Sequence, residues 1–154
     1  MVFPFRDMRK CRLIYKSKIG PKLQEPGKLE ELAERASSNN AETGITGLLL
    51  LTGEQILQVL EGPGRFVNQL YAKIINDERH LDIELISYES IDGTLFYDWN
   101  MRFLDLRKLP PSVHALLLMK YPHDDDDVIT IPTDLINTLS LLIDAKNAGL
   151  TSPA

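Results

Sequence analysis

Two apolar segments joined by a single dipeptide constrain the fold of this chain more than any other feature. Residues 45–52 and 55–60 have the composition of strands, and Gly53-Glu54 between them indicates a hairpin turn. Side chains alternate along a strand, so the second segment has two faces, which carry Ile56, Gln58 and Leu60 on one side and Leu57 and Val59 on the other. Because both faces are apolar, the sequence predicts a sheet that is covered on both sides.

Gln58 is a neutral amide in the interior of that apolar strand. An unpaired buried amide costs roughly 1 to 3 kcal/mol, so the side chain needs partners for its donor and for its acceptor. We therefore expect Gln58 to be engaged in hydrogen bonds through both groups.

Strand and helix periods alternate in a regular order on either side of the hairpin. Strand patterns cover residues 11–17, 83–90 and 99–106. Two helical patterns are also present: the first begins at residue 28, and the second covers residues 66–75. The first helix is predicted to end near Ser37–Asn40 and to turn Arg35 away from its apolar stripe of Leu29, Leu32, Ala33 and Ala36. The β-α-β-β-α-β-β order predicts an α+β, ferredoxin-like sheet with both helices on one face and the first and third strands side by side in its middle. Tyr15 and Gln58 would then be neighbours.

The C-terminal region is expected to cover the other face of the sheet. One helix after Pro110-Pro111 is indicated by Val113, Leu116, Leu117 and Met119. A second helix, opened by Thr133-Asp134 and closed by Gly149, is indicated by Leu135, Ile136, Leu139, Leu142 and Ile143. We expect this region to pack on the sheet or at an oligomer interface rather than to form a second domain.

Composition narrows the classes of partner. The formal net charge of -5 disfavours a nucleic-acid phosphate backbone. Cys11 is the single cysteine, which excludes an internal disulfide and suits a reducing compartment. We find neither a signal peptide nor the run of about 20 apolar residues that a membrane span needs, so we expect a cytoplasmic protein that does not enter the membrane. The acidic run Asp124–Asp127 after His123 is interpreted as solvated charge, and no metal site is predicted.

Several neutral hydrogen-bonding and soft apolar side chains would meet where the helices cover the sheet. They are Tyr15, Asn39, Asn40, Gln58, Trp99 and Met101. A planar ring with alternating carbonyl and N–H groups would satisfy them, and a flavin has such an edge. Taken singly, each also has a structural explanation: core packing for the tyrosine, tryptophan and methionine, and a helix cap or turn for the asparagines.

The chain also resembles the BLUF family, the sensors of blue light using FAD, over about residues 11 to 103. The resemblance is carried by Arg12-Leu13-Ile14-Tyr15-Lys16-Ser17, Asn39-Asn40, Thr43-Gly44-Ile45-Thr46-Gly47-Leu48-Leu49, Leu57-Gln58-Val59-Leu60-Glu61-Gly62, Asp77-Glu78-Arg79-His80 and Trp99-Asn100-Met101. The C-terminal helices are similar, more loosely, to those of short, stand-alone members of the PixD type. The expected organisation is an N-terminal extension (1–10), a flavin-binding BLUF domain (11–106) and a C-terminal helical extension (107–154), with no effector domain.

This resemblance implies a blue-light photoreceptor without substrate turnover, with FAD, or FMN or riboflavin as substitutes, between the two helices. Tyr15 and Gln58 would lie at the reactive edge of the ring, and Asn39 and Asn40 would hold it, Asn40 at its carbonyl and N–H edge. The second helix region would supply Lys73, Asp77, Arg79 and His80 toward the ribityl chain, the phosphates and the ring. Light-driven electron and proton transfer from Tyr15 through Gln58 would rearrange the hydrogen bonds to the flavin. Trp99 and Met101 would carry the change to the last strand and C-terminal helices, and from there to a downstream signalling protein. Either of the two could lie beside Gln58 in the dark, and the sequence does not decide between them. A homo-oligomer is also expected.

Other interpretations of the same residues stay open at the level of sequence. Asp77 and Arg79 could form a solvated ion pair, worth about 0 to 1 kcal/mol, and His80 could cap a helix end. A regulatory ligand-binding module without photochemistry would keep Asn40 and Gln58 but would not need Tyr15. A small acylphosphatase-like hydrolase would want an arginine-rich loop after the first strand, where this chain offers only Lys16, Lys18 and Lys22.

Overall fold

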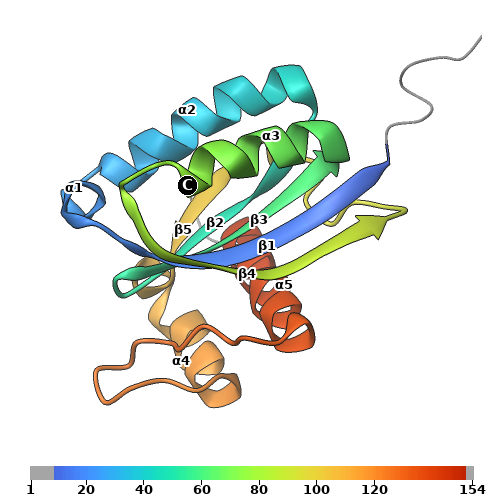
Figure 1. The fold of residues 1–154 in the computed structure, drawn as a ribbon. Coiled ribbons are helices and arrows are strands. Elements are labelled where there is room, and N and C mark those ends of the chain that lie inside the picture. The colour runs from blue at the N-terminus through green and yellow to red at the C-terminus, as the bar shows by residue number, and fades with distance from the viewer. Residues whose placement is uncertain (1–8, 152–154) are drawn as a thin grey trace, which may run out of the picture.

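A five-stranded sheet forms the middle layer, with helices on both of its faces (Figure 1). The computed structural model describes residues 9–151. The elements are β1 (Lys10–Ile19), α1 (Pro21–Gln24), α2 (Lys28–Thr43), β2 (Thr46–Thr52), β3 (Gln55–Pro63), α3 (Gly64–Ile75), β4 (His80–Ile91), β5 (Arg102–Asp105), the 3-10 turn η1 (Leu106–Lys108), α4 (Pro111–Lys120) and α5 (Leu135–Thr151).

The strand order β4-β1-β3-β2-β5 places β1 and β3 next to each other in the middle of the sheet, as predicted. They are antiparallel, and Tyr15 lies directly opposite Gln58. The β2–β3 hairpin closes through Gly53-Glu54, with Thr52 opposite Gln55. The α+β, ferredoxin-like prediction is confirmed, and the sheet is mixed because β2 and β5 run parallel.

Each face of the sheet has its own hydrophobic core. On the α2 and α3 side, the buried residues include Leu13, Tyr15, Leu49, Ile56, Leu60 and Val67. On the opposite side, they include Ile14, Leu57, Val59, Leu117, Leu141, Leu142 and Ala145. Figure 1 shows α2 and α3 on one side and α4 and α5 on the other. The two apolar faces of β3 are therefore both covered, as its alternation predicted.

Helix α2 extends to Thr43, so the predicted end near Ser37–Asn40 was wrong. Gly44 caps the C-terminus of the helix, and its φ of 77° lies in the left-handed region that glycine adopts readily. The Gly44 N–H donates to Asn40 O at 2.9 Å. Asn40 is therefore inside the last turn of the helix and not in a loop.

The last strand is shorter than predicted and begins at Arg102, so Trp99 and Met101 precede it. Two hydrogen bonds hold residues 99–101, which precede β5. Gly47 N–H donates to Trp99 O at 2.7 Å, and Asn40 Nδ2 donates to Asn100 O at 2.9 Å. Trp99 and Met101 are both buried, but they belong to opposite cores, Met101 on the α2 side and Trp99 on the α5 side.

The C-terminal helices lie where expected, but their predicted apolar stripes are only partly buried. Leu117 is buried, whereas Leu116, Met119 and Ile136 are exposed. Helix α5 also continues through Gly149, which was wrongly expected to end it. Because a Cβ at this position would meet the Leu104 side chain at 3.0 Å, glycine allows α5 to lie close to the sheet.

Most of the expected N-terminal extension lies outside the described residues, and its last residue, Lys10, opens β1. The acidic run forms an exposed turn in which Asp124 Oδ1 accepts from the N–H groups of Asp126 and Val128 at 2.9 and 3.0 Å. Within residues 9–151, no helix combines the length and apolar character that crossing a membrane requires.

A buried carboxylate ties the β4–β5 connection to the middle of the sheet. Glu61 on β3 is fully buried and lies opposite Arg12 on β1. Arg12 Nε donates to Glu61 Oε2 at 2.8 Å, and the N–H groups of Leu95 and Phe96 each donate to Glu61 Oε1 at 2.8 Å. Arg12 also donates to the half-buried Glu89 at 3.2 Å. Glu61 therefore fixes the segment that leads into Trp99 and Met101.

Replacing Glu61 with leucine should lower the free energy of unfolding by about 3–5 kcal/mol, because it leaves two buried N–H groups without an acceptor and leaves the buried Arg12 with only the partly exposed Glu89. The matched control is Glu84→Leu. Glu84 pairs with Lys16 at 3.4 Å on the exposed β4 edge, where the loss should be about 1 kcal/mol or less. Urea unfolding followed by circular dichroism measures both, and equal losses would contradict this assignment.

Candidate functional site

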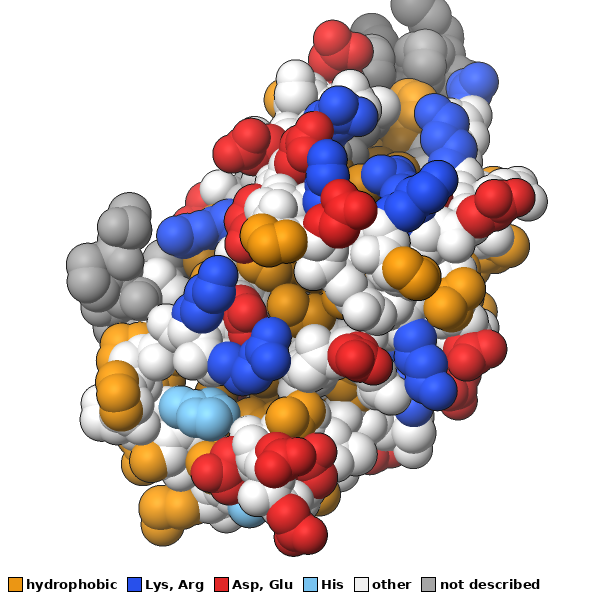
Figure 2. Space-filling model, turned by 90° about the vertical axis from the view of Figure 1, so that its left-hand side faces the viewer, with side chains coloured by type: hydrophobic (Ala, Val, Ile, Leu, Met, Phe, Trp, Pro, Cys, Tyr) orange, Lys and Arg blue, Asp and Glu red, His pale blue; other side chains and the backbone are white. Residues whose placement is uncertain are grey.

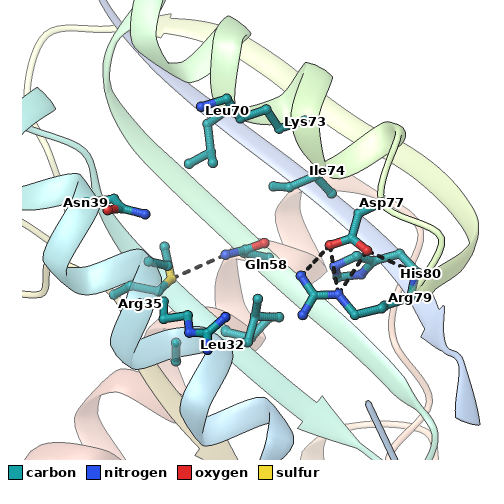
Figure 3. A pocket seen from close by; sticks show the side chains of 14 residues that line it. Leu32, Arg35, Asn39, Gln58, Leu70, Lys73, Ile74, Asp77, Arg79 and His80 are labelled. Atoms are coloured by element: carbon teal, nitrogen blue, oxygen red, sulfur yellow. Dashed lines mark hydrogen bonds and ion pairs between the residues drawn. The ribbon is translucent and has the colours of Figure 1, made fainter. Parts of the chain in front are cut away.

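A cavity of about 240 Å³ lies between α2, α3 and the sheet (Figure 3). Its walls are largely apolar and come from both helices, and its floor is formed by the middle strands and Met101. It is lined by Leu32, Ala33, Arg35, Ala36, Asn39, Leu49, Gln58, Leu70, Lys73, Ile74, Asp77, Arg79, His80 and Met101. Such a mixture of apolar walls with a few convergent polar groups is typical of small-molecule sites.

Gln58 lies at the centre of this cavity and uses both ends of its amide, as predicted. Its Oε1 accepts a hydrogen bond from the Tyr15 hydroxyl. Its Nε2 donates to the Met101 sulfur at 3.3 Å. A thioether sulfur is a weak acceptor, so the amide is held firmly on the tyrosine side and loosely on the methionine side.

Tyr15 is completely buried behind Gln58 and does not line the cavity itself. Its ring packs at 5.6 Å from the Tyr71 ring and at 6.3 Å from the His80 ring, measured between centroids. Burial raises the pKa of Tyr15 well above its ordinary value, with a smaller contribution from Tyr71. The phenol is therefore neutral, and its hydroxyl proton points at the Gln58 carbonyl.

Charged side chains gather at one end of the cavity, after α3. Arg79 Nε and Nη2 donate to Asp77 at 2.9 and 2.6 Å, and the Arg79 N–H donates to the same carboxylate at 3.0 Å. The side-chain hydrogen bond from Arg79 lowers the pKa of Asp77 to about 2. The pair is half-buried and lines the cavity, so the interpretation as a merely solvated ion pair does not fit its position.

His80 opens β4 and is buried, whereas the residue that caps α3 is Asn76. Its Nδ1 is hydrogen bonded to Ser17 Oγ at 3.2 Å. Burial lowers the pKa of His80, while the charge of Asp77 raises it and that of Arg79 lowers it. His80 therefore presents a neutral ring beside Tyr15.

The two asparagines of α2 occupy different environments. Asn39 lines the cavity, as Figure 3 shows, whereas Asn40 is buried and donates its Nδ2 to Asn100 O. Asn40 does not line the cavity, which disagrees with the expectation that it holds the edge of a ligand. Its hydrogen bond to Asn100 instead positions the segment that carries Met101.

Trp99 does not line the cavity: its ring lies in the opposite core, with the Arg102 guanidinium 4.5 Å from its centroid. Of Trp99 and Met101, between which the sequence did not decide, Met101 is therefore the one beside Gln58. One expectation needs correction. Arg35 was expected to face away from the apolar stripe, but it lines the cavity with Leu32 and Asn39. The spacing of Arg35 and Asn39, four residues apart on one helix, could have placed them on one face. Lys73 lines the cavity from α3.

The cavity fits a planar, largely apolar ring that has polar groups on its edge. Gln58 and Asn39 offer neutral donors and acceptors along its length, and Arg79 offers a cation at one end. Among residues 9–151, no three His, Cys, Asp or Glu side chains are arranged to hold a metal ion.

The sequence model of the family described as BLUF, sensors of blue-light using FAD, matches residues 11–102, more than half of the chain. The blue light- and temperature-regulated antirepressor BluF of Escherichia coli (strain K12) is 35% identical over 96 residues, which are 62% of this chain and 23% of that protein. Photoactivated adenylate cyclase subunit beta of Euglena gracilis is 34% identical over 109 residues, 69% of this chain and 13% of that one. The chain therefore spans less than a quarter of the length of either relative.

A solved structure gives the same result for the fold. BlrB, a BLUF protein in its dark state, is 28% identical and aligns with a TM-score of 0.65 over 90% of this chain and 97% of that one. The agreement extends beyond residue 102, so it includes part of the C-terminal helical region.

The His80 imidazole should titrate below its ordinary value of about 6.5, because burial disfavours its charged form. Asp77→Asn should lower this pKa further, and Arg79→Gln should raise it, since the two charges act in opposite directions. Its contribution to stability is then complete above a pH of about 6.5 and is lost as the pH falls through the folded-state value. An NMR titration of the imidazole protons tests this, and the same direction of shift in both variants would refute the assignment.

Proposed function

The chain belongs to the BLUF family of blue-light sensors, and on that basis we propose that it is a photoreceptor whose photochemistry runs from Tyr15 through Gln58. The observation that supports this most directly is the hydrogen bond from the Tyr15 hydroxyl to the Gln58 carbonyl, at the floor of the cavity. A binding module without photochemistry would have no use for a buried phenol at this position. We propose a photoreceptor that does not turn over a substrate.

We propose that the cavity binds a flavin, FAD in the first instance, with FMN and riboflavin as substitutes. Gln58 and Asn39 would hydrogen bond the polar edge of the ring, and the apolar residues of α2 and α3 would cover its faces. Asp77, Arg79 and His80 would hold the end that leads to the ribityl chain, with Lys73 nearby. Asn40 donates one N–H to Asn100 O, so its second N–H and its Oδ1 would serve a ring that reaches it.

Bound flavin would supply absorption of blue light and, once excited, an acceptor for one electron. Tyr15 would donate that electron. Because burial keeps the phenol protonated, its proton must leave together with the electron. Gln58 Oε1 is the acceptor in place: it would take the phenolic proton while Nε2 released one to the reduced ring, so that the ring would gain one electron and one proton. When electron and proton return to Tyr15, the amide is left rotated or tautomerised, with a different set of hydrogen bonds and no net oxidation.

The contacts of residues 95–101 offer a path from Gln58 to helix α5. Met101 touches the Gln58 amide, and Trp99, two residues earlier, lies in the core beneath α5. Lys146 on α5 donates to Leu95 O at 2.5 Å, and its ammonium lies 5.7 Å from the Trp99 ring centroid. We propose that a change in the Gln58–Met101 contact moves this segment and, through Lys146, moves α5.

Exposed apolar side chains on α4 and α5 provide a surface that this movement could alter. Leu116, Met119 and Ile136 are 65%, 85% and 79% exposed. We propose that this surface mediates association, with further copies of the chain and with a downstream signalling protein.

Gln58→Leu should keep flavin bound but abolish the reversible red shift of its absorption under blue light, because leucine can neither accept the phenolic proton nor exchange hydrogen bonds. Tyr15→Phe should likewise stop the ordinary photocycle, since it removes the donor. Difference spectroscopy of the purified variants before and after illumination measures both effects. A normal red shift in Gln58→Leu would rule out the proposed relay.

Lys146→Gln should leave the red shift intact but reduce the light-induced change in α5, because the link to Leu95 O and the aromatic rings is weakened. Hydrogen exchange of residues 135–151, compared between dark and light, provides the measurement. Lys120→Gln is the matched control, since Lys120 pairs with Asp144 of α5 at 2.8 Å from the α4 side, away from residues 95–101. An unchanged light response of α5 in Lys146→Gln would show that the signal takes another route.

A further inference from the structure

Tyr15 packs against a second phenol, Tyr71 of α3. The two rings lie 5.6 Å apart between centroids and are tilted by 49°, whereas the imidazole of His80 lies at 6.3 Å. Centroid separations of about 4.5 to 7 Å are those of aromatic rings in contact. Tyr71 therefore touches the proposed electron donor, although it takes no part in the hydrogen bond between Tyr15 and Gln58.

Tyr71 lies on the side of Tyr15 that faces away from the cavity between α2 and α3. Its neighbours on the helix, Leu70 and Ile74, line that cavity, but Tyr71 does not. Tyr15 is completely buried, whereas Tyr71 is half-buried and so reaches solvent. The order from the cavity outward is therefore Gln58, Tyr15, Tyr71 and water.

The two phenols differ in where their protons can go. The Tyr15 hydroxyl donates to Gln58 Oε1 in the interior. The Tyr71 hydroxyl makes no hydrogen bond to any residue of the described part of the chain, 9–151. Burial raises the pKa of Tyr71, so this phenol is also neutral. A neutral phenol is oxidised most readily when its proton leaves with the electron, and Tyr71 can release its proton directly to water.

Building on the proposed function, we propose that Tyr71 is a second electron donor that reduces oxidised Tyr15, so that prolonged light leaves the bound flavin reduced and silences the sensor. Tyr71 would pass one electron to Tyr15 and its phenolic proton to water. Tyr15 would recover its own proton by the reverse of the Gln58 relay. The net transfer is one electron from Tyr71 to the bound flavin and one proton from Tyr71 to water.

A thiol in the surroundings would make this transfer permanent. It would return one electron and one proton to Tyr71, and two such events would join two thiols as one disulfide. In weak light, the electron and proton return to Tyr15 and only the amide rearrangement remains. Under prolonged light, the occasional transfers from Tyr71 accumulate, because the thiol removes the oxidised phenol before the electron can come back. Each flavin is reduced once and then stops absorbing blue light, so the process is not a turnover.

The surface near the end of α3 carries charges of both signs. Helix α3 ends towards the face that Figure 2 shows, where basic and acidic side chains are interspersed. A neutral thiol, dithiothreitol, is therefore the suitable probe, because its access depends on the exposure of the phenol and not on attraction to a charged patch.

The test is continuous blue illumination of the full chain with bound FAD, under argon and with dithiothreitol, while the flavin absorption is recorded. The unaltered chain should bleach steadily. Tyr71→Phe should lose most of this bleaching but keep the reversible red shift after a brief flash, because phenylalanine fills nearly the same space and cannot donate. Tyr15→Phe should lose both the bleaching and the red shift.

A radical trap provides a readout that is independent of the photocycle. When a nitroso trap replaces the thiol, illumination should leave an adduct on the peptide that contains Tyr71, identified by mass spectrometry, and Tyr15→Phe should abolish it. Tyr88→Phe is the matched control, since Tyr88 lies opposite Leu13 and not opposite Tyr15, and its hydroxyl donates to Asn68 at 2.7 Å. It should leave the bleaching, the red shift and the adduct unchanged.

The possible failures are distinguishable. No bleaching in the unaltered chain, or equal bleaching in Tyr71→Phe, would overturn the inference and leave the photoreceptor proposal standing. An adduct on Tyr97, which is 73% exposed, without one on Tyr71 would also overturn it, because the electron would then come by another route. Absence of the reversible red shift in the unaltered chain would instead refute the proposed function itself.

Discussion

The pairing of Tyr15 with Gln58 across the two middle strands is the contact on which the rest of the site depends. A phenol at this depth keeps its proton, and its hydroxyl contacts the glutamine carbonyl. The pairing is a matter of register: β1 and β3 are antiparallel, and the two residues are directly opposite. A slip of one residue would turn one of the two side chains into the other core. The apolar cover on both faces of the sheet prevents such a slip and thereby preserves the contact.

The same pair of strands also anchors the segment that would transmit a change. Glu61 follows Gln58 by three residues on β3, and it holds the N–H groups of Leu95 and Phe96 from the opposite face. One strand thus carries both the amide that would change its hydrogen bonds and the carboxylate that fixes the start of the responding segment. With one end held by Glu61, movement at Met101 has to be taken up between residues 95 and 101, where Lys146 of α5 makes its contacts.

The sequence was sufficient for the order of the elements, the middle position of β1 and β3 and the closeness of Tyr15 to Gln58, because alternation and helical spacing record which faces are buried. It was insufficient where a single long-range contact decides the outcome. Asn40 turns from the cavity because Asn100 O accepts from it, and that carbonyl is 60 positions away. Trp99 and Met101 were placed on a strand, whereas hydrogen bonds to Gly47 and Asn40 hold them ahead of it. Such contacts leave no periodic pattern.

The choice of an amide at position 58 follows from what a switch between two states requires. A carboxylate there would bring a charge into an apolar site, and an apolar side chain could not relay a proton. A carboxamide is neutral, donates at one end and accepts at the other, and exchanges the two by rotation. Its donor end rests on the Met101 sulfur, a weak acceptor, so rotation gives up one firm and one weak hydrogen bond. Since a typical hydrogen bond contributes about 1 kcal/mol net, the two orientations differ by little, and new contacts made by a bound ring can decide between them.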